Sequence, residues 1–205
     1  HQGAAGTRIL PIAHQAPLPL DRLIVSDAPG DEALEMDVVI VGAGPAGLAC
    51  ALELTRLVKR EQEAGRELPD LNIAVLEKAD SLGEHNLSGA VINPRALREL
   101  FPDLEDANFP FRQHVDVESV YFMTEQRALR IPTPPTMHNR GYHTASICEL
   151  VRWLGERAEA AGCNLCLGFP VDALLVDGRR VRGVRTTPSG LDRDGTPGYG
   201  YTAPT

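Results

Sequence analysis

The spacing of apolar residues changes several times along the chain, and each change marks an expected element. Val38–Val41 is a run of β-branched side chains, which is typical of a buried parallel strand. The apolar residues that come next repeat at helical spacing as far as Leu57. Asn72–Leu76 is a second apolar run, so the pattern predicts a strand, a helix and a parallel strand in one βαβ unit.

Two further helices are expected. Pro94–Leu104 has proline in its first turn and ends near Phe101–Pro102. Thr144–Ala161 carries its apolar residues on one helical face, and a glycine follows as a stop signal. Within this helix, Ser146 with Glu149 three residues later resembles a capping box.

Two stretches predict β-hairpins. Val115–Thr124 alternates between apolar and polar residues and is followed by Ala128–Ile131, with Glu125–Gln126 as the turn. This pattern indicates a strand excursion towards a substrate-facing sheet; the alternative is an irregular surface insertion. Further along, strands are expected at residues 163–169, 171–176 and 181–186, and Asp177–Gly178 is a strong hairpin signal between the last two.

The first expected strand and helix are joined by Gly42-x-Gly44-x-x-Gly47. In such a turn the first glycine permits a tight bend, the second lets the backbone approach a pyrophosphate, and the third lets helix and strand pack closely. The free N–H groups and the positive dipole end of the helix then face the phosphates. The motif alone is weak evidence, but its flanking strand and helix supply the required context and predict a dinucleotide-binding half.

Glu77 follows the second expected strand, at the position where a carboxylate binds the ribose in this kind of fold. It lies farther beyond Gly47 than the usual spacing of about 20 residues. The polar stretch Lys59–Asp70 accounts for the excess as a longer helix end and loop. A carboxylate here serves the ribose of FAD or of NAD(P). The alternative is an α/β turn that binds no nucleotide, with Glu77 at the surface.

The loop Glu77–Pro94 contains Gly83, Ser88 and Gly89, so its backbone can come close to a ligand. His85 in this loop is either a catalytic acid or base or, as is commoner for an isolated histidine, a hydrogen-bonding or solvent-facing residue.

Composition excludes several classes of protein. The net charge of -8 and the absence of a Lys/Arg run argue against a nucleic-acid surface. The apolar runs are too short to span a bilayer. The four cysteines suggest a reducing compartment rather than a disulfide scaffold.

A metal or redox role for Cys163-x-x-Cys166 is the less favoured interpretation, because residues three apart on a strand point to opposite faces. Core packing is favoured for this pair, and Cys50 and Cys148 are likewise expected to be small core residues.

Residues 37–54 and 77–104 resemble the electron-transfer flavoprotein–ubiquinone oxidoreductase family. They read DVVIVGAGPAGLACALEL and EKADSLGEHNLSGAVINPRALRELFPDL. The resemblance continues through Arg130–Pro132, the helix LVRWLGERAEAAG and Gly168–Pro170, and it covers residues 36–197. The GAGPAGL turn is shared by FAD-dependent oxidoreductases in general, whereas the LSGA loop followed by ELFPD is more specific.

The resemblance implies an α/β fold: a Rossmann-like FAD-binding domain with a parallel sheet plus an added antiparallel β excursion, apparently truncated at the C-terminus. Residues 1–35 are rich in proline and have little apolar periodicity, so they are expected to be an N-terminal extension that lies on the surface or is partly disordered. Residues 36–108 would be the FAD-binding βαβ half, 109–140 a β insertion towards a substrate or quinone domain, and 141–205 an incomplete continuation of the FAD-binding domain.

The resemblance also implies non-covalently bound FAD, with Gly42, Gly44, Ala46 and Gly47 on the pyrophosphate. Glu77 would bind the adenosine ribose, Val171 would lie near the adenine, and the Gly83–Ala90 loop would lie along the cofactor towards the flavin. No catalytic acid or base is expected, because the redox chemistry belongs to the cofactor, and no metal ligand is expected. The expected cofactor-binding residues are Val41, Gly42, Ala43, Gly44, Pro45, Ala46, Gly47, Glu77, Lys78, Gly83, Ser88, Gly89, Ala90 and Val171.

The activity that the resemblance implies is that of an FAD-dependent oxidoreductase that passes electrons from reduced electron-transfer flavoprotein to ubiquinone. Its place would be the inner membrane face, on the bacterial cytoplasmic or mitochondrial matrix side. The family's [4Fe–4S] ligands, quinone-binding domain and membrane contact are expected in parts absent from this chain, which alone would be soluble. The alternatives are a geranylgeranyl-reductase/FixC-like flavoprotein and a non-catalytic nucleotide-binding fragment.

Overall fold

The computed structural model describes residues 16–30, 33–105, 108–191 and 196–202 of the chain. The expected βαβ unit consists of β2 (Val38–Val41), α2 (Pro45–Glu63) and β3 (Ile73–Glu77). β3 pairs in parallel with β2 on one side and with β9 (Asn164–Leu167) on the other. The parallel sheet expected from the sequence is therefore confirmed.

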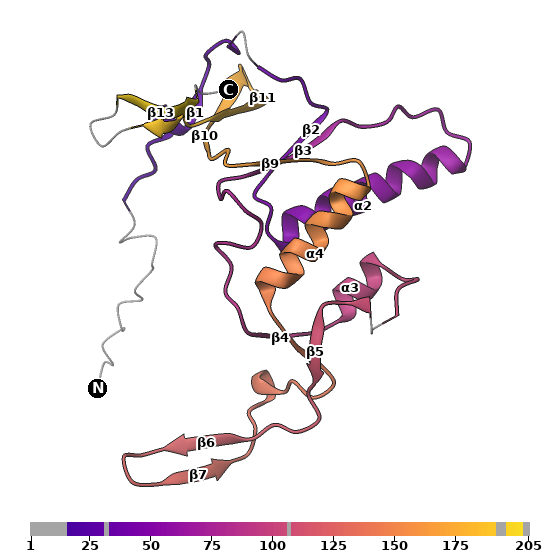
Figure 1. Ribbon diagram of the computed structural model, residues 1–205, viewed down its shortest axis with the longest axis vertical. Helices are drawn as coiled ribbons and strands as arrows, with labels where there is room; N and C mark the ends of the chain where they lie inside the picture. The colour runs from indigo at the N-terminus through magenta and orange to yellow at the C-terminus, as the bar shows by residue number, and fades with distance from the viewer. Residues whose placement is uncertain (1–15, 31–32, 106–107, 192–195, 203–205) are drawn as a thin grey trace, which may run out of the picture.

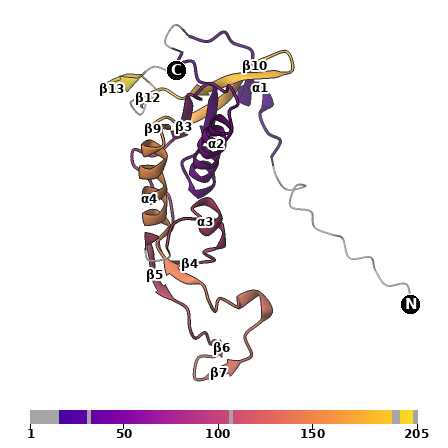
Figure 2. The ribbon, with the colours of Figure 1, turned by 90° about the vertical axis from the view of Figure 1, so that its right-hand side faces the viewer.

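The core lies between this sheet and two helices, α2 and α4 (Ile147–Ala160), which lie side by side (Figures 1 and 2). Leu48 of α2 and Val75 of β3 are fully buried, and Leu154 of α4 is 1% exposed. Because each buried aliphatic side chain contributes about 1.5–3 kcal/mol, this packing holds helices and sheet together. The other sheet residues of this core are Val38, Ile40, Ile73 and Leu165.

The start of α4 differs from the expected helix. Thr144 belongs to β8 (His143–Ala145), and the helix begins at Ile147. Ser146 takes the N-cap position, but its side chain makes no capping hydrogen bond, so the expected capping box does not form. Pairing of β8 with strands on both sides keeps the chain extended up to this point, and this long-range pairing overrides the local helix signal.

The end of α4 agrees with the expectation. Gly162 has a φ of +96° and donates its N–H to the Glu159 carbonyl at 2.9 Å. The Cys163 N–H donates to the Ala158 carbonyl at 2.9 Å. This pair of bonds is a Schellman motif, which stops the helix at a residue that tolerates positive φ.

A second sheet lies at the N-terminal end of α4 (Figure 1). It is antiparallel, in the order β4 (Ala90–Ile92), β8 and β5 (Phe111–His114). α3 (Arg95–Leu100) begins after Pro94 and ends before Phe101, as expected. Aromatic rings attach this sheet to α4: Phe109 lies 5.3 Å from Phe111 and 5.6 Å from Trp153, between ring centroids.

The expected hairpin is present as β6 (Val120–Met123) and β7 (Ala128–Ile131), which pair antiparallel. Its first strand is shorter than expected, because it begins at Val120 and not at Val115. The hairpin projects from the rest of the chain (Figure 1), and η3 (Pro135–Met137) follows it. At its base the Glu118 carboxylate accepts hydrogen bonds from the Asn139 N–H and from His138 Nδ1, both at 2.6 Å. The Asn139 bond, with His138 second, holds the pKa of Glu118 below its usual value.

A third sheet contains β1 (Ile24–Val25), β10 (Val171–Asp177) and β11 (Arg180–Thr186). The hairpin between the last two is confirmed, but its central turn residues are Gly178 and Arg179, because Asp177 pairs with Arg180. After α1 (Leu20–Leu23), β1 joins the edge of β10 in parallel. Part of the expected surface extension is thus a strand of the sheet. β12 (Ser189–Leu191) and β13 (Pro197–Thr202) form a separate hairpin.

The four cysteines are all free. Cys163 is buried, and its Sγ lies 3.5 Å from Thr55 Oγ1. Burial raises the pKa of the Cys166 thiol, which disfavours the reactive thiolate. Cys148 is half-buried and donates to the Asn86 carbonyl. The expectation that Cys50 is a core residue is wrong, because it lies on the exposed side of α2.

Replacing Gly162 by alanine is expected to lower the free energy of unfolding by about 1 kcal/mol or more, because a Cβ strains the backbone at positive φ. A Cβ there meets nothing within 4 Å, so no clash contributes. Gly30 also lies in open space but has no positive φ. Gly30→Ala should therefore change the free energy of unfolding by less than about 0.5 kcal/mol. Urea denaturation measures both, and equal losses would contradict the assignment of the helix stop.

Candidate functional site

The glycine-rich turn leaves the N-terminus of α2 open. Gly42 has a φ of +99° and donates its N–H to the Leu76 carbonyl at 2.7 Å. Gly44 is the N-cap residue and Pro45 takes the first helical position. A Cβ on Gly44 would meet nothing within 4 Å, and the first turn of α2 carries no acidic residue. The positive end of the helix dipole therefore suits an anion such as a phosphate.

Gly47 is the point of closest approach between α2 and the turn. A Cβ at this position would lie 2.0 Å from the Gly42 carbonyl oxygen and 3.3 Å from Ile40 Cγ2. A distance of 2.0 Å to backbone oxygen is impossible for carbon, so only glycine permits this packing. The role expected for the third glycine, close packing of helix on strand, matches this geometry.

Glu77 lies beside the glycine turn because β2 and β3 are parallel and in register, with Val41 opposite Leu76. One carboxylate oxygen accepts the Ala43 N–H at 2.9 Å, and the other accepts the Ala79 N–H at 3.0 Å. Each oxygen has a second lone pair, so the carboxylate can still accept hydrogen bonds from the hydroxyls of a sugar. The side chain thus ties the turn to the end of β3 and keeps acceptor capacity.

The turn between β9 and β10 is held against the end of β3 and the residues that follow it. The Phe169 N–H donates to the Glu77 carbonyl and the Gly168 N–H to the Ala79 carbonyl, both at 2.9 Å. Val171, the expected adenine neighbour, is half-buried two residues later. The structure therefore brings the segment before Val171 to Glu77.

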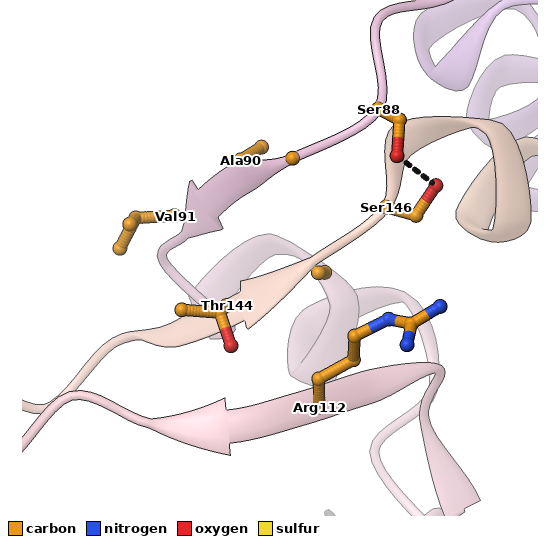
Figure 3. Close-up of a pocket in the computed structure, with 8 residues that line it drawn as sticks. Ser88, Ala90, Val91, Arg112, Thr144 and Ser146 are labelled. Atoms are coloured by element: carbon orange, nitrogen blue, oxygen red, sulfur yellow. Dashed lines mark hydrogen bonds between the residues drawn. The ribbon is translucent and has the colours of Figure 1, made fainter.

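The loop after Glu77 leads to a cavity at the N-terminal end of α4. Gly83, at a φ of +81°, packs so closely that a Cβ would lie 2.7 Å from the Cys148 carbonyl oxygen. Beyond it, Ser88 Oγ lies 3.3 Å from Ser146 Oγ (Figure 3). The cavity has a volume of about 380 Å³ and is lined by Ser88, Gly89, Ala90, Val91, Arg112, Thr144, Ala145 and Ser146.

The expected site residues fall into two groups. Val41, the glycine turn and Glu77 form one, and Ser88, Gly89 and Ala90 belong to the other, at the cavity. Lys78 and His85 are exposed. In the described part of the chain, no group of three or more His, Cys, Asp or Glu is arranged to hold a metal ion.

Sequence reasoning missed Arg112, Thr144 and Ser146, which join the cavity from β5, β8 and the start of α4. Ser146 had a visible signal, but it was interpreted as a helix cap. Ser146 is 5% exposed, and its hydroxyl lies beside that of Ser88 instead. Arg112 and Thr144 had no local signal, because only strand pairing brings them to the loop.

Gly47→Ala is expected to destabilise the chain by about 1–3 kcal/mol or more, as overpacking against fixed backbone does. Gly44→Ala is the matched change in the same turn and should cost less than about 1 kcal/mol, since its Cβ points into open space. Thermal unfolding with circular dichroism compares the two. Equal stability of the two variants would disprove the close approach of α2 to the turn.

No protein-family model matches the chain. It is 42% identical over 171 residues to the mitochondrial electron transfer flavoprotein-ubiquinone oxidoreductase of Dictyostelium discoideum, covering 83% of this chain and 27% of that protein. It is 42% identical over 178 residues to the protein of the same name from Pseudomonas aeruginosa, covering 84% of this chain and 31% of that protein. The chain thus spans less than a third of the length of these curated relatives.

Solved structures are more distant. A geranylgeranyl bacteriochlorophyll reductase-like protein from Thermoplasma acidophilum is 17% identical, with a TM-score of 0.46 over 74% of this chain and 34% of that one. PqsL, a probable FAD-dependent monooxygenase from Pseudomonas aeruginosa, is 20% identical, with a TM-score of 0.47 over 78% of this chain and 39% of that one. The curated relatives therefore carry the comparison: over the matched segment, the chain is similar to electron transfer flavoprotein-ubiquinone oxidoreductases.

Proposed function

We propose that this chain is the FAD-binding part of an oxidoreductase that passes electrons from reduced electron-transfer flavoprotein to ubiquinone. The observation that carries the proposal is the hydrogen bond from the Ala43 N–H, in the glycine turn, to the Glu77 carboxylate, beside the N-terminus of α2. The names of the relatives, at 42% identity, supply the donor and the acceptor.

The residues of the turn fit the pyrophosphate and adenosine of FAD. The space in front of Gly44 leaves room for phosphate oxygens beside the backbone of Ala46 and Gly47. Glu77 has acceptor capacity for the ribose hydroxyls, because the amides of Ala43 and Ala79 use only part of it. We assign the adenine to the start of β10, near Val171, since the turn that leads into this strand is bonded to Glu77 through Phe169.

The ring end of FAD is assigned to the cavity at Ser88. The chain that follows Glu77 passes through Gly83–Ala90 to this cavity, so it connects the ribose-binding group with a cavity that Ser88 and Ser146 line. Its backbone conformation is fixed where Gly83 packs on α4. A cofactor with two ends joined by a pyrophosphate matches this arrangement of two groups better than a mononucleotide does.

FAD, when bound, supplies the electron-transfer chemistry, and the chain supplies binding, orientation and local charge. The turn and Glu77 hold the nucleotide half. Ser88 and Ser146 offer hydroxyl groups to the ring, and no side chain is assigned a proton-transfer role. The four cysteines do not fit a [4Fe–4S] cluster, because three of them lie on different elements, α2, α4 and β9, and Cys163, which precedes β9, is buried against Thr55. No cluster ligand is assigned to this chain.

A location at a membrane face forms part of the proposal, since ubiquinone is a membrane-dissolved acceptor. None of the helices in the described ranges is long and apolar enough to cross a membrane. The β6–β7 hairpin instead presents Tyr121, Phe122, Met123 and Leu129, each more than half exposed. With Arg127 and Arg130 on the same hairpin, this surface suits the interface of an anionic bilayer.

Two other functions make different predictions. A geranylgeranyl-reductase/FixC-like flavoprotein would also bind FAD but would not accept electrons from electron-transfer flavoprotein. A non-catalytic fragment, or an NAD(P)-binding one, would show no flavin uptake. The sequence identity to ubiquinone oxidoreductases favours the proposed oxidoreductase function over these two alternatives.

The test is the visible spectrum of the purified chain during titration with FAD. Stoichiometric uptake with shifted flavin bands is expected. Glu77→Gln should weaken binding by about tenfold or more, since it removes a charged acceptor from the ribose site. Glu99→Gln is the matched control, because Glu99 pairs with Arg95 on the surface of α3. A folded chain that takes up no FAD, or equal affinities for both variants, would refute the proposal.

A further inference from the structure

Arg112 is the charged side chain among the residues that line the Ser88–Ser146 cavity. It comes from β5 and forms an ion pair with Glu149, in the first turn of α4. Both side chains are largely exposed, at 63% and 44%. An exposed pair of this kind contributes little, so Arg112 can exchange Glu149 for another acceptor at small cost.

The other polar groups of the cavity also favour an acceptor ligand. Ser88 and Ser146 are bonded to each other, and either hydroxyl can donate. Thr144 Oγ1 is engaged with the backbone of Gln113 on β5, which fixes its side chain beside Arg112. In Figure 3 the Arg112 side chain extends along the cavity towards Ser146. A guanidinium beside this pair of serine hydroxyls matches a planar ring that carries carbonyl oxygens.

We propose that Arg112 binds the ring end of the dinucleotide, and that Glu149 competes with the ring for it. Without the dinucleotide, Arg112 is held by Glu149; with it, Arg112 would donate to a carbonyl oxygen of the ring. This inference rests on the proposed function, because it takes the ligand to be FAD. It makes Glu149 a residue that opposes binding, and it places a positive charge beside the redox-active ring.

The two partners are therefore expected to have opposite effects. Arg112→Ala should weaken FAD binding by about tenfold or more, which is the usual effect of losing a charged hydrogen bond. Glu149→Gln should strengthen FAD binding severalfold, because it frees the guanidinium. Arg112→Ala should also make the midpoint potential of the bound flavin more negative, because the lost cation favoured the added electrons.

The experiment titrates the chain and these variants with FAD and, separately, with ADP, which occupies only the turn and Glu77. ADP affinity should be the same in all variants. Arg95→Ala is the control, because it breaks a similarly exposed ion pair, with Glu99, away from the cavity. Melting temperatures show whether each variant is folded.

Parallel loss of FAD affinity in Arg112→Ala and Glu149→Gln would mean that the pair is only structural, and unchanged affinity in both would mean that Arg112 does not reach the ring. Reduced ADP binding in Arg112→Ala would place its effect outside the cavity. Each of these results overturns the inference while leaving the proposed function in place. Failure of the wild-type chain to bind FAD is the distinct result that overturns both.

Discussion

The contact of Gly47 with the Gly42 carbonyl is the constraint on which the site depends. Because residue 47 has no side chain, α2 starts directly against the end of β2. Its N-terminus then points into open space at Gly44, instead of being displaced from the sheet by a Cβ. Any larger residue would move the helix and with it the backbone amides that suit an anion. The same packing buries Leu48 in the core, so the geometry of the site and the stability of the domain share one contact.

The parallel pairing of β2 and β3 extends this arrangement to the carboxylate. With Val41 opposite Leu76, the residue after Leu76 must lie beside the turn after Val41. Glu77 uses this position to bind the Ala43 and Ala79 amides, which links the turn, the sheet and the start of the following loop. That loop then reaches α4, where Gly83 packs on Cys148 and Ser88 meets Ser146. Ser88 and Ser146, which lie far apart in the sequence, thus meet at the cavity.

Ser146 illustrates how a local rule can be displaced. A serine with a glutamate three residues later favours a capping box, yet the side chain faces the cavity and Glu149 pairs with Arg112. β8 runs into the helix without a turn, and its pairing with β4 and β5 fixes the direction of the backbone at Ser146. The helix start is therefore set by the sheet. For the same reason, Ser146 lines the cavity and Glu149 pairs with Arg112 instead of capping the helix.

The sequence by itself determined the elements whose signals are local. The apolar run at Val38–Val41, the glycine turn, the helical period of α4 and the stop at Gly162 each follow from the conformational preferences of neighbouring residues. The resemblance to the oxidoreductase family also followed from sequence alone. Only the tertiary structure decided which distant residues meet: Arg112 with Glu149, Ser88 with Ser146, and β1 with the edge of β10. It also decided that Cys50 faces outward on α2. The physical reason is that strand pairing and helix packing join residues many positions apart, and no local pattern records which partner a side chain will meet.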